Sequence, residues 1–184
     1  MEKTSFSFSV SISNVTTNDK NTVISSSLST LPVIINKAAY CNLKSGIPSN
    51  SQLISNRAGW IINVEEGVEG APNNLIDGKT GTDVALNNKG FWFTVDLGEA
   101  KVLTGIKTNH WANAYAPREV EILQSENGTT WKSLSSLAIS PGGTQNITFI
   151  SPITTRYLKY QIITISTNGR TDVTEFNVYE PKSE

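Results

Sequence analysis

Short runs in which apolar and polar residues alternate dominate the chain from residue 59 onward. In "REVEILQSENG", for example, Val120 and Ile122 alternate with glutamates. A period of two places successive side chains on opposite faces of a strand, so each run predicts a strand with one buried face. Asn-Gly turn signals at 127–128 and 168–169 fall between such runs. The pattern predicts an all-β antiparallel sandwich or barrel.

The predicted strand runs continue to the end of the chain, and no long amphipathic helix or internal repeat interrupts them. In order, the runs are "GWIINVEEG", "GFWFTVDLG", "KVLTGIKTNHW", "REVEILQSENG", "WKSLSSLAI", "TQNITFISPI", "RYLKYQIITIS" and "VTEFNVYE". "APNNLIDGKTGTDVA" lies between the first two as a polar loop.

The N-terminal part carries the same alternation over a shorter length. In "FSFSVSI", residues 6–12, apolar residues alternate with serine, whereas a signal peptide has a continuous apolar core. Two or three strands cannot bury a core alone, so this part either extends the next domain or ends an upstream one. We expect an extra N-terminal β segment over 1–40, the end of an upstream β-sandwich, then a linker over 41–51 and a β-sandwich domain over 52–184.

Composition excludes several classes of function. Hydrophobic residues make up 38% and charged residues 17%, and the net charge is −1 with no basic block, which argues against nucleic-acid binding. No stretch approaches the roughly 20 apolar residues of a transmembrane helix. A single cysteine, Cys41, allows no internal disulfide, and one histidine with one cysteine cannot build a zinc site. A metal here would have to prefer oxygen ligands, as calcium does.

The loop over residues 71–85 contains Gly78-Lys79-Thr80, the ending of a phosphate-binding P-loop. A P-loop also needs a glycine at position 73, which is Asn73, and a helix after the loop. Neither is present, so the nucleotide hypothesis fails. A calcium loop and a plain turn remain.

Five segments together resemble one family. "IDGKTGTD", "FWFTVDLGEAKVLTGI", "REVEILQSENGTTW", "RYLKYQI" and "TEFNVYE" occur in the order and at the separations of the discoidin, or coagulation factor V/VIII C-type, domain. The resemblance covers about residues 52–180. It implies a galactose-binding-like jelly-roll sandwich, the fold of bacterial carbohydrate-binding modules. "LPVIINKA" is similar to the end of the immunoglobulin-like domain that precedes such modules in bacterial surface lipoproteins.

The resemblance also implies a structural calcium ion. Matched one residue at a time, its ligands are the side chains of Asp77, Thr82 and Glu175 and carbonyls near Asn74 and Lys79. The alternative is a turn held by Asp and Thr hydrogen bonds, with the glutamate an ordinary strand residue.

A second loop, "TNHWANAYAPR", concentrates residues suited to a sugar. Trp111 and Tyr115 offer aromatic faces for the C–H patch of a pyranose, and His110 and Asn109 offer polar groups for its hydroxyls.

Sugar sites of the family lie on several loops at one end of the sandwich, so two other loops join the candidate site. "LNNKG" supplies Asn87 and Asn88, and "STNGRTD" supplies Arg170. The chain departs from the family at Val84 and Ala85, where an aromatic residue, often followed by histidine, is usual. Either the loop of His110 and Trp111 supplies the sugar contacts instead, or the module has lost sugar binding; we look for the contacts at His110 and Trp111.

These observations favour a non-catalytic carbohydrate-binding module of a secreted or cell-surface bacterial protein, with a terminal sugar as partner and further domains in a longer parent chain. An enzyme is not expected, because no Gly-x-Ser-x-Gly motif occurs and no pair of carboxylates is indicated in a cleft. The alternatives are a protein- or membrane-adhesion module of discoidin type and a structural spacer.

Overall fold

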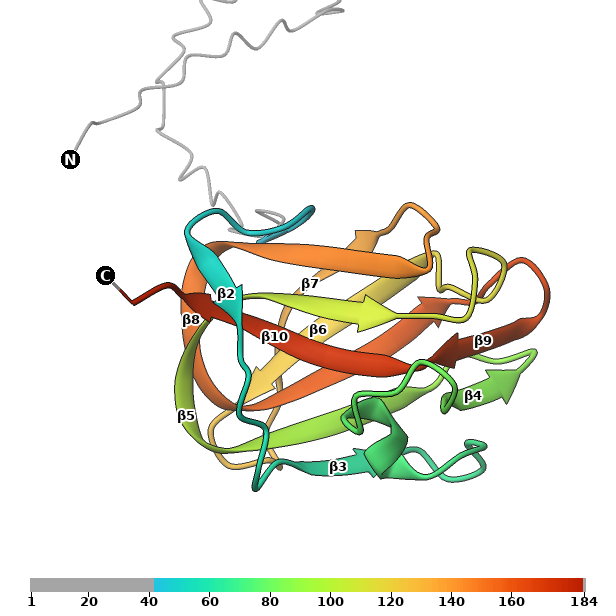
Figure 1. The fold of residues 1–184 in the computed structure, drawn as a ribbon, viewed down its shortest axis with the longest axis horizontal. Helices are drawn as coiled ribbons and strands as arrows, with labels where there is room; N and C mark the ends of the chain where they lie inside the picture. The colour runs from blue at the N-terminus through green and yellow to red at the C-terminus, as the bar shows by residue number, and fades with distance from the viewer. Residues whose placement is uncertain (1–41, 184) are drawn as a thin grey trace, which may run out of the picture. The chain divides into compact units, whose positions relative to one another are not determined.

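The computed structural model describes residues 42–183, which fold into ten strands and one short 3₁₀ helix (Figure 1). The strands are β1 (Leu43–Ser45), β2 (Ser51–Leu53), β3 (Ile61–Val64), β4 (Val84–Asn87), β5 (Trp92–Asn109), β6 (Glu119–Ser125), β7 (Lys132–Ala138), β8 (Thr144–Thr164), β9 (Arg170–Val173) and β10 (Glu175–Pro181). The 3₁₀ helix η1 (Pro72–Leu75) begins at a proline, whose fixed φ suits a first helical position.

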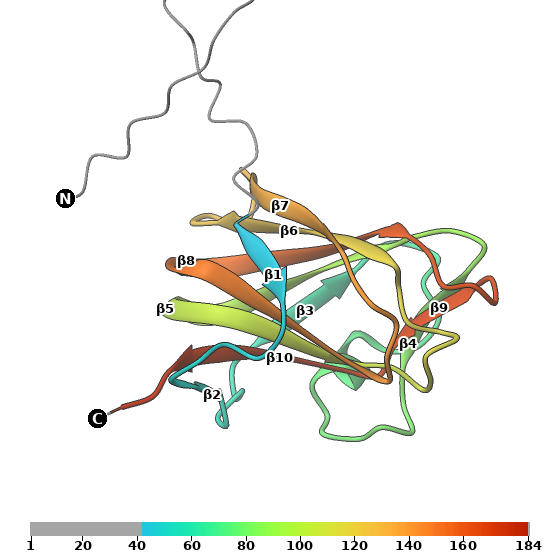
Figure 2. The same ribbon diagram turned by 90° about the horizontal axis from the view of Figure 1, so that it is seen from above.

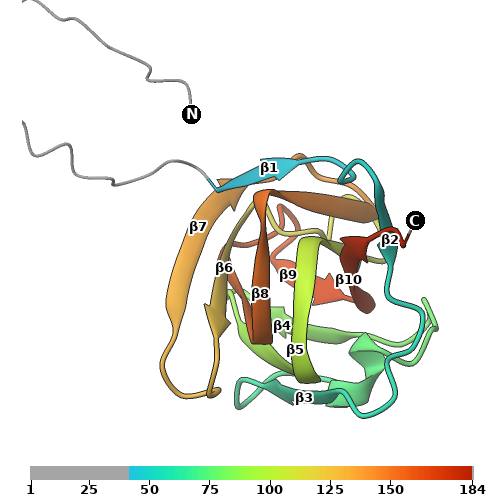
Figure 3. The ribbon, with the colours of Figure 1, turned by 90° about the vertical axis from the view of Figure 1, so that its left-hand side faces the viewer.

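Two long strands, β5 and β8, run through both layers of a sandwich. They run side by side (Figure 3) and pair antiparallel over most of their length. The register of this pairing shifts between Asp96 and Lys101, at the bend. One layer has the order β2-β10-β5-β8-β1, and the other has the order β3-β5-β8-β6-β7. Since each long strand contributes its two halves to different layers, the sandwich is closed at the bend.

Aromatic side chains join the two layers. Phe93 on β5 stacks on Tyr160 of β8 with ring centroids 5.1 Å apart, and its edge meets Phe176 of β10 at 5.2 Å. All three are buried. The alternation of buried and partly exposed residues along β6 and β10 puts one face of each strand into this core.

Close approach of β5 and β8 requires a glycine at Gly105. A Cβ atom at this position would lie 2.3 Å from the carbonyl oxygen of Ile147 and 2.8 Å from Cγ of Pro48. Any side chain larger than hydrogen would therefore push the two strands apart.

The prediction of an all-β antiparallel sandwich is confirmed, with differences of detail. Four of the predicted runs merge into β5 and β8, because each pair is continuous through the bend. Residues 43–45, placed in the predicted linker over 41–51, form β1 and pair with β8. The predicted β segment over 1–40 lies outside the described residues.

A two-stranded sheet of β4 and β9 closes one end of the sandwich, on the right of Figures 1 and 2. Apart from Val173, its residues belong to loops in the sequence-based prediction. The bend of β5 and β8 lies at the opposite end. Within residues 42–183, no helix has the length and apolar character to cross a membrane.

Candidate functional site

The loop that follows β5 presents two aromatic residues at the β4–β9 end. Trp111 is 54% exposed, and Tyr115 meets its ring edge-on with centroids 6.3 Å apart. The loop is tied to β9, because the amide of Asp172 donates to the carbonyl of Tyr115 at 3.2 Å. An exposed indole is thus held on an anchored loop.

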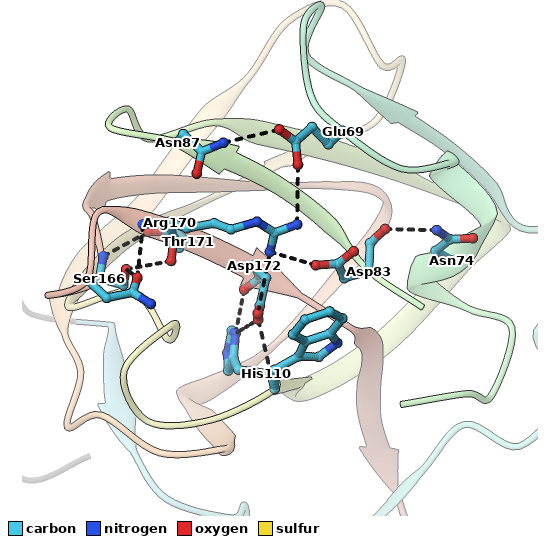
Figure 4. A network of polar contacts seen from close by, with 11 residues as sticks. Glu69, Asn74, Asp83, Asn87, His110, Ser166, Arg170, Thr171 and Asp172 are labelled. Carbon is cyan, nitrogen blue, oxygen red and sulfur yellow. Dashed lines mark hydrogen bonds and ion pairs between the residues drawn. The ribbon is translucent and has the colours of Figure 1, made fainter. Parts of the chain in front are cut away.

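Arg170, the first residue of β9, lies between this loop and two acids (Figure 4). Its guanidinium carbon is 5.6 Å from the centre of the Trp111 ring. Nη1 donates to Oδ2 of Asp83 at 2.8 Å, and Nη2 donates to Oε2 of Glu69 at 3.3 Å. Burial alone would lower the pKa of Arg170, but the hydrogen bonds with Asp83 and then Glu69 outweigh it and raise the pKa. The guanidinium therefore stays charged and fixed in direction.

His110 lies beneath this surface and does not reach solvent. Its side chain has 0% exposure, and its Nδ1 donates to the backbone carbonyl of Asp172 at 2.6 Å. With a proton on Nδ1, the other ring nitrogen, Nε2, forms a hydrogen bond with the hydroxyl of Thr108 at 3.0 Å. The predicted direct sugar contact of His110 is thus not available in this arrangement. The residue positions β9 under the loop.

Asp172 is a buried acid that the sequence did not bring to attention. It has no exposed surface, and Oδ1 accepts the amide of Trp111 at 3.3 Å. Oδ2 has no hydrogen-bond partner among residues 42–183 and lies 3.9 Å from Nη1 of Arg170. Its charge is therefore offset mainly by the guanidinium, which links the buried acid to the surface.

The predicted asparagines take separate positions. The amide of Asn87 donates to Oε1 of Glu69 at 3.1 Å, which joins it to the same network. Asn88 has a left-handed backbone with φ of 56°. Its backbone N–H donates to the carbonyl of Gly169 at 2.6 Å, so Asn88 holds two loops together. Asn109 donates to the hydroxyl of Thr144 and lies outside the network.

We refer to the residues gathered at this end as the Trp111 cluster. Its members are Glu69, Asp83, Asn87, Trp111, Tyr115, Arg170 and Asp172. The sequence analysis missed all three acids: Asp172 is only two positions after Arg170, whereas 101 and 87 positions separate Glu69 and Asp83 from Arg170. No local spacing could have connected Glu69 and Asp83 to Arg170.

The predicted calcium residues meet at a different corner, where β10 begins. Asp77 accepts the amide of Lys79 and the hydroxyl of Thr82, both at 2.8 Å, and so closes its own loop. Glu175 accepts the amide of Gly78 at 3.0 Å with Oε2 and forms an ion pair with Arg57 through Oε1.

Asn74, another residue of the predicted calcium set, makes its side-chain contact with the loop of the Trp111 cluster. Its side-chain amide donates to the carbonyl of Asp83 at 2.8 Å and so supports the loop of the Trp111 cluster.

Comparison with protein-family models finds one match, the F5/8 type C domain, over residues 55–176. The chain belongs to the F5/8 type C domain family. The discoidin resemblance is thus confirmed. Comparison with curated proteins gives no match.

Solved structures share the fold of this F5/8 type C domain at low identity. An F5/8 type C domain from Bacteroides fragilis has a TM-score of 0.62 and 20% identity, over 74% of this chain and 100% of that one. The family 32 carbohydrate-binding module of NanJ from Clostridium perfringens, in complex with galactose, has a TM-score of 0.55 and 22% identity, over 75% and 99%. The corresponding module of AlyQ, in complex with 4,5-unsaturated mannuronic acid, has a TM-score of 0.55 and 22% identity, over 64% and 92%.

Calcium does not fit the corner of this F5/8 type C domain as it is arranged. Calcium needs six to eight oxygen ligands, whereas a guanidinium, itself a cation, lies against the carboxylate of Glu175. The carboxylate of Asp77 is directed to donors of its own loop. The calcium ion stays a prediction that this arrangement does not support.

The departure at Val84 and Ala85 affects the core of the F5/8 type C domain. Both residues are completely buried, and Ala85 forms an isolated bridge with Glu69. Small side chains here leave the surface above β4 to Glu69, Asn87 and Arg170, so this part of the end presents charged and amide groups.

Proposed function

We propose that this chain is a non-catalytic carbohydrate-binding module of a secreted or cell-surface bacterial protein, and that the Trp111 cluster holds a terminal sugar. The site is a surface presented by anchored loops, which suits a shallow, preformed contact. Further domains of a longer parent chain and repeated glycan ends would add avidity to a modest affinity of the single module.

The observation that carries this proposal is the exposed ring of Trp111 beside fixed hydrogen-bonding groups. A pyranose offers an apolar C–H face to an indole and hydroxyls around its rim. The guanidinium of Arg170 donates, and the carboxylates of Glu69 and Asp83 accept, within the same network. The sugars bound by the family 32 modules of NanJ and AlyQ give the same fold a precedent for this class of ligand.

The experiment is a glycan array followed by calorimetric titration of the glycans that bind. Trp111→Ala removes the aromatic face, and we expect a loss of about 2 kcal/mol or more in binding free energy, roughly 30-fold in Kd. Trp131→Ala is the matched control, because this half-buried tryptophan precedes β7, near the opposite end. The control is expected to keep wild-type affinity.

Two results would overturn the proposal. The first is an array on which the folded protein binds no glycan while it captures a protein or lipid partner independently of Trp111. The second is glycan binding that Trp111→Ala leaves unchanged, which would place the site elsewhere on the domain.

A further inference from the structure

The charges of the Trp111 cluster are unbalanced. Three carboxylates, those of Glu69, Asp83 and Asp172, lie 3.3, 2.8 and 3.9 Å from the guanidinium of Arg170. Three formal negative charges against one positive charge leave a formal charge of −2 around the exposed face of Trp111. Asp172 is completely buried, so water screens its charge less than that of a surface acid.

The one cation of this network is already engaged. Both terminal nitrogens of Arg170 donate to carboxylates of the protein, Nη1 to Asp83 and Nη2 to Glu69, and its side chain is only 25% exposed. Recognition of an anion by arginine relies on two parallel N–H donors directed at the ligand. In this cluster those donors are directed at Asp83 and Glu69.

We infer that the Trp111 cluster selects an uncharged pyranose and excludes sugar acids such as uronates; this inference rests on the function proposed above. A hydroxyl both donates and accepts, so an uncharged sugar can donate to the oxygens of Glu69 and Asp83. A ligand carboxylate only accepts, and its charge adds to three like charges. Glu69 sets this selectivity at the surface, since its side chain is 55% exposed.

The fold by itself does not decide between an uncharged sugar and a sugar acid. The two family 32 modules of the same fold are in complex with galactose, which is uncharged, and with 4,5-unsaturated mannuronic acid, which carries a carboxylate. The fold alone therefore does not decide between the two classes of sugar, and the inference for this chain rests on the charges of its own cluster.

The test uses disaccharides in matched pairs that differ only at C6, as a primary alcohol or a carboxylate, from the galacto, gluco and manno series. Each pair is titrated into the wild type, Glu69→Gln and the control Glu126→Gln. Glu126 is an exposed acid that follows β6 at the bend end, so its substitution removes the same charge far from the cluster. Melting curves establish that all three proteins are folded.

We expect the wild type to bind the alcohol of at least one pair and to bind its uronate at least about tenfold more weakly at low salt. Glu69→Gln should narrow this ratio by about fivefold, while Glu126→Gln leaves it unchanged. A wild type that binds a uronate as tightly as the matched alcohol would overturn the inference and leave the sugar-binding proposal intact. A ratio that Glu69→Gln does not narrow would also overturn it. A wild type that binds neither member of any pair, and no other glycan on the array, would overturn both.

Discussion

The ion pair between Arg57 and Glu175 engages a carboxylate that the family resemblance assigns to calcium. The two side chains are 19% and 15% exposed, and Nη1 of Arg57 also donates to the carbonyl of Phe176 at 3.0 Å. The guanidinium thereby links the loop before β3 to the start of β10. Arg57→Gln removes this charge and leaves Glu175 with only the amide of Gly78 as a donor.

The expected loss lies between that of a surface pair and that of a buried pair. Breaking an exposed pair costs about 0–1 kcal/mol and leaving a buried charge unpaired costs about 3–5 kcal/mol, so a mostly covered pair with some solvent screening gives about 2 kcal/mol. For a domain of this size the melting temperature should fall by about 4–8 °C. Arg57→Lys, which keeps the charge but not the planar guanidinium, should lose less.

The assay is thermal melting of the wild type and both variants with excess calcium and with chelator. If the folded domain binds calcium, a free calcium concentration of about 100 times the Kd would raise the free energy of unfolding by about 2.7 kcal/mol. We expect no such response from the wild type. Calcium should stabilise Arg57→Gln more than the wild type, because the carboxylate of Glu175 then lacks its counter-charge near Asp77. A wild-type melting temperature that falls on chelation would refute this reasoning and restore the calcium site implied by the family.

Two further predictions concern stability. The hydrogen bond from Arg156 holds the pKa of Asp96 below its ordinary 3.8, against the opposing effect of burial. The ionised carboxylate of Asp96 therefore stabilises the fold at pH values above 3.8, and this stabilisation is lost as the pH falls through the lowered pKa. In urea unfolding, the free energies of unfolding of the wild type and Arg156→Ala should differ at neutral pH and converge in acid. A difference that persists at pH 2 would contradict this origin. Gly105→Ala should lower the free energy of unfolding by at least about 2 kcal/mol, because the new Cβ would lie 2.3 Å from the carbonyl oxygen of Ile147. An unchanged urea midpoint would show that β5 and β8 separate without strain.

Many features of the fold follow from local patterns. The period-two alternation predicted β6, β7 and β10, and the Asn-Gly signal predicted the turn in which Gly128 takes a φ of 73°. The continuity of β5 and β8 was not visible, since a bend and a break in the alternation look alike in the sequence.

The candidate site divides in the same way. Residue types alone indicated Trp111, Tyr115 and Arg170 as candidates, because aromatic faces and hydrogen-bonding groups on loops suit a sugar. Residue type also indicated His110 as a sugar contact. Its side chain is buried and hydrogen-bonded to the backbone carbonyl of Asp172, so it supports the site from beneath.

The sequence by itself determined the strand pattern, the turns and the family, because each rests on residues near one another in the chain or on segments in a fixed order. Only the tertiary structure decided the charge of the site and the partner of Glu175. Asp83 and Arg170 meet through the antiparallel pairing of β4 with β9, and Glu69 joins them through its bridge with Ala85. Arg57 reaches Glu175 across 118 positions. Side-chain contacts over such separations depend on strand register and layer order, which local periodicity does not specify.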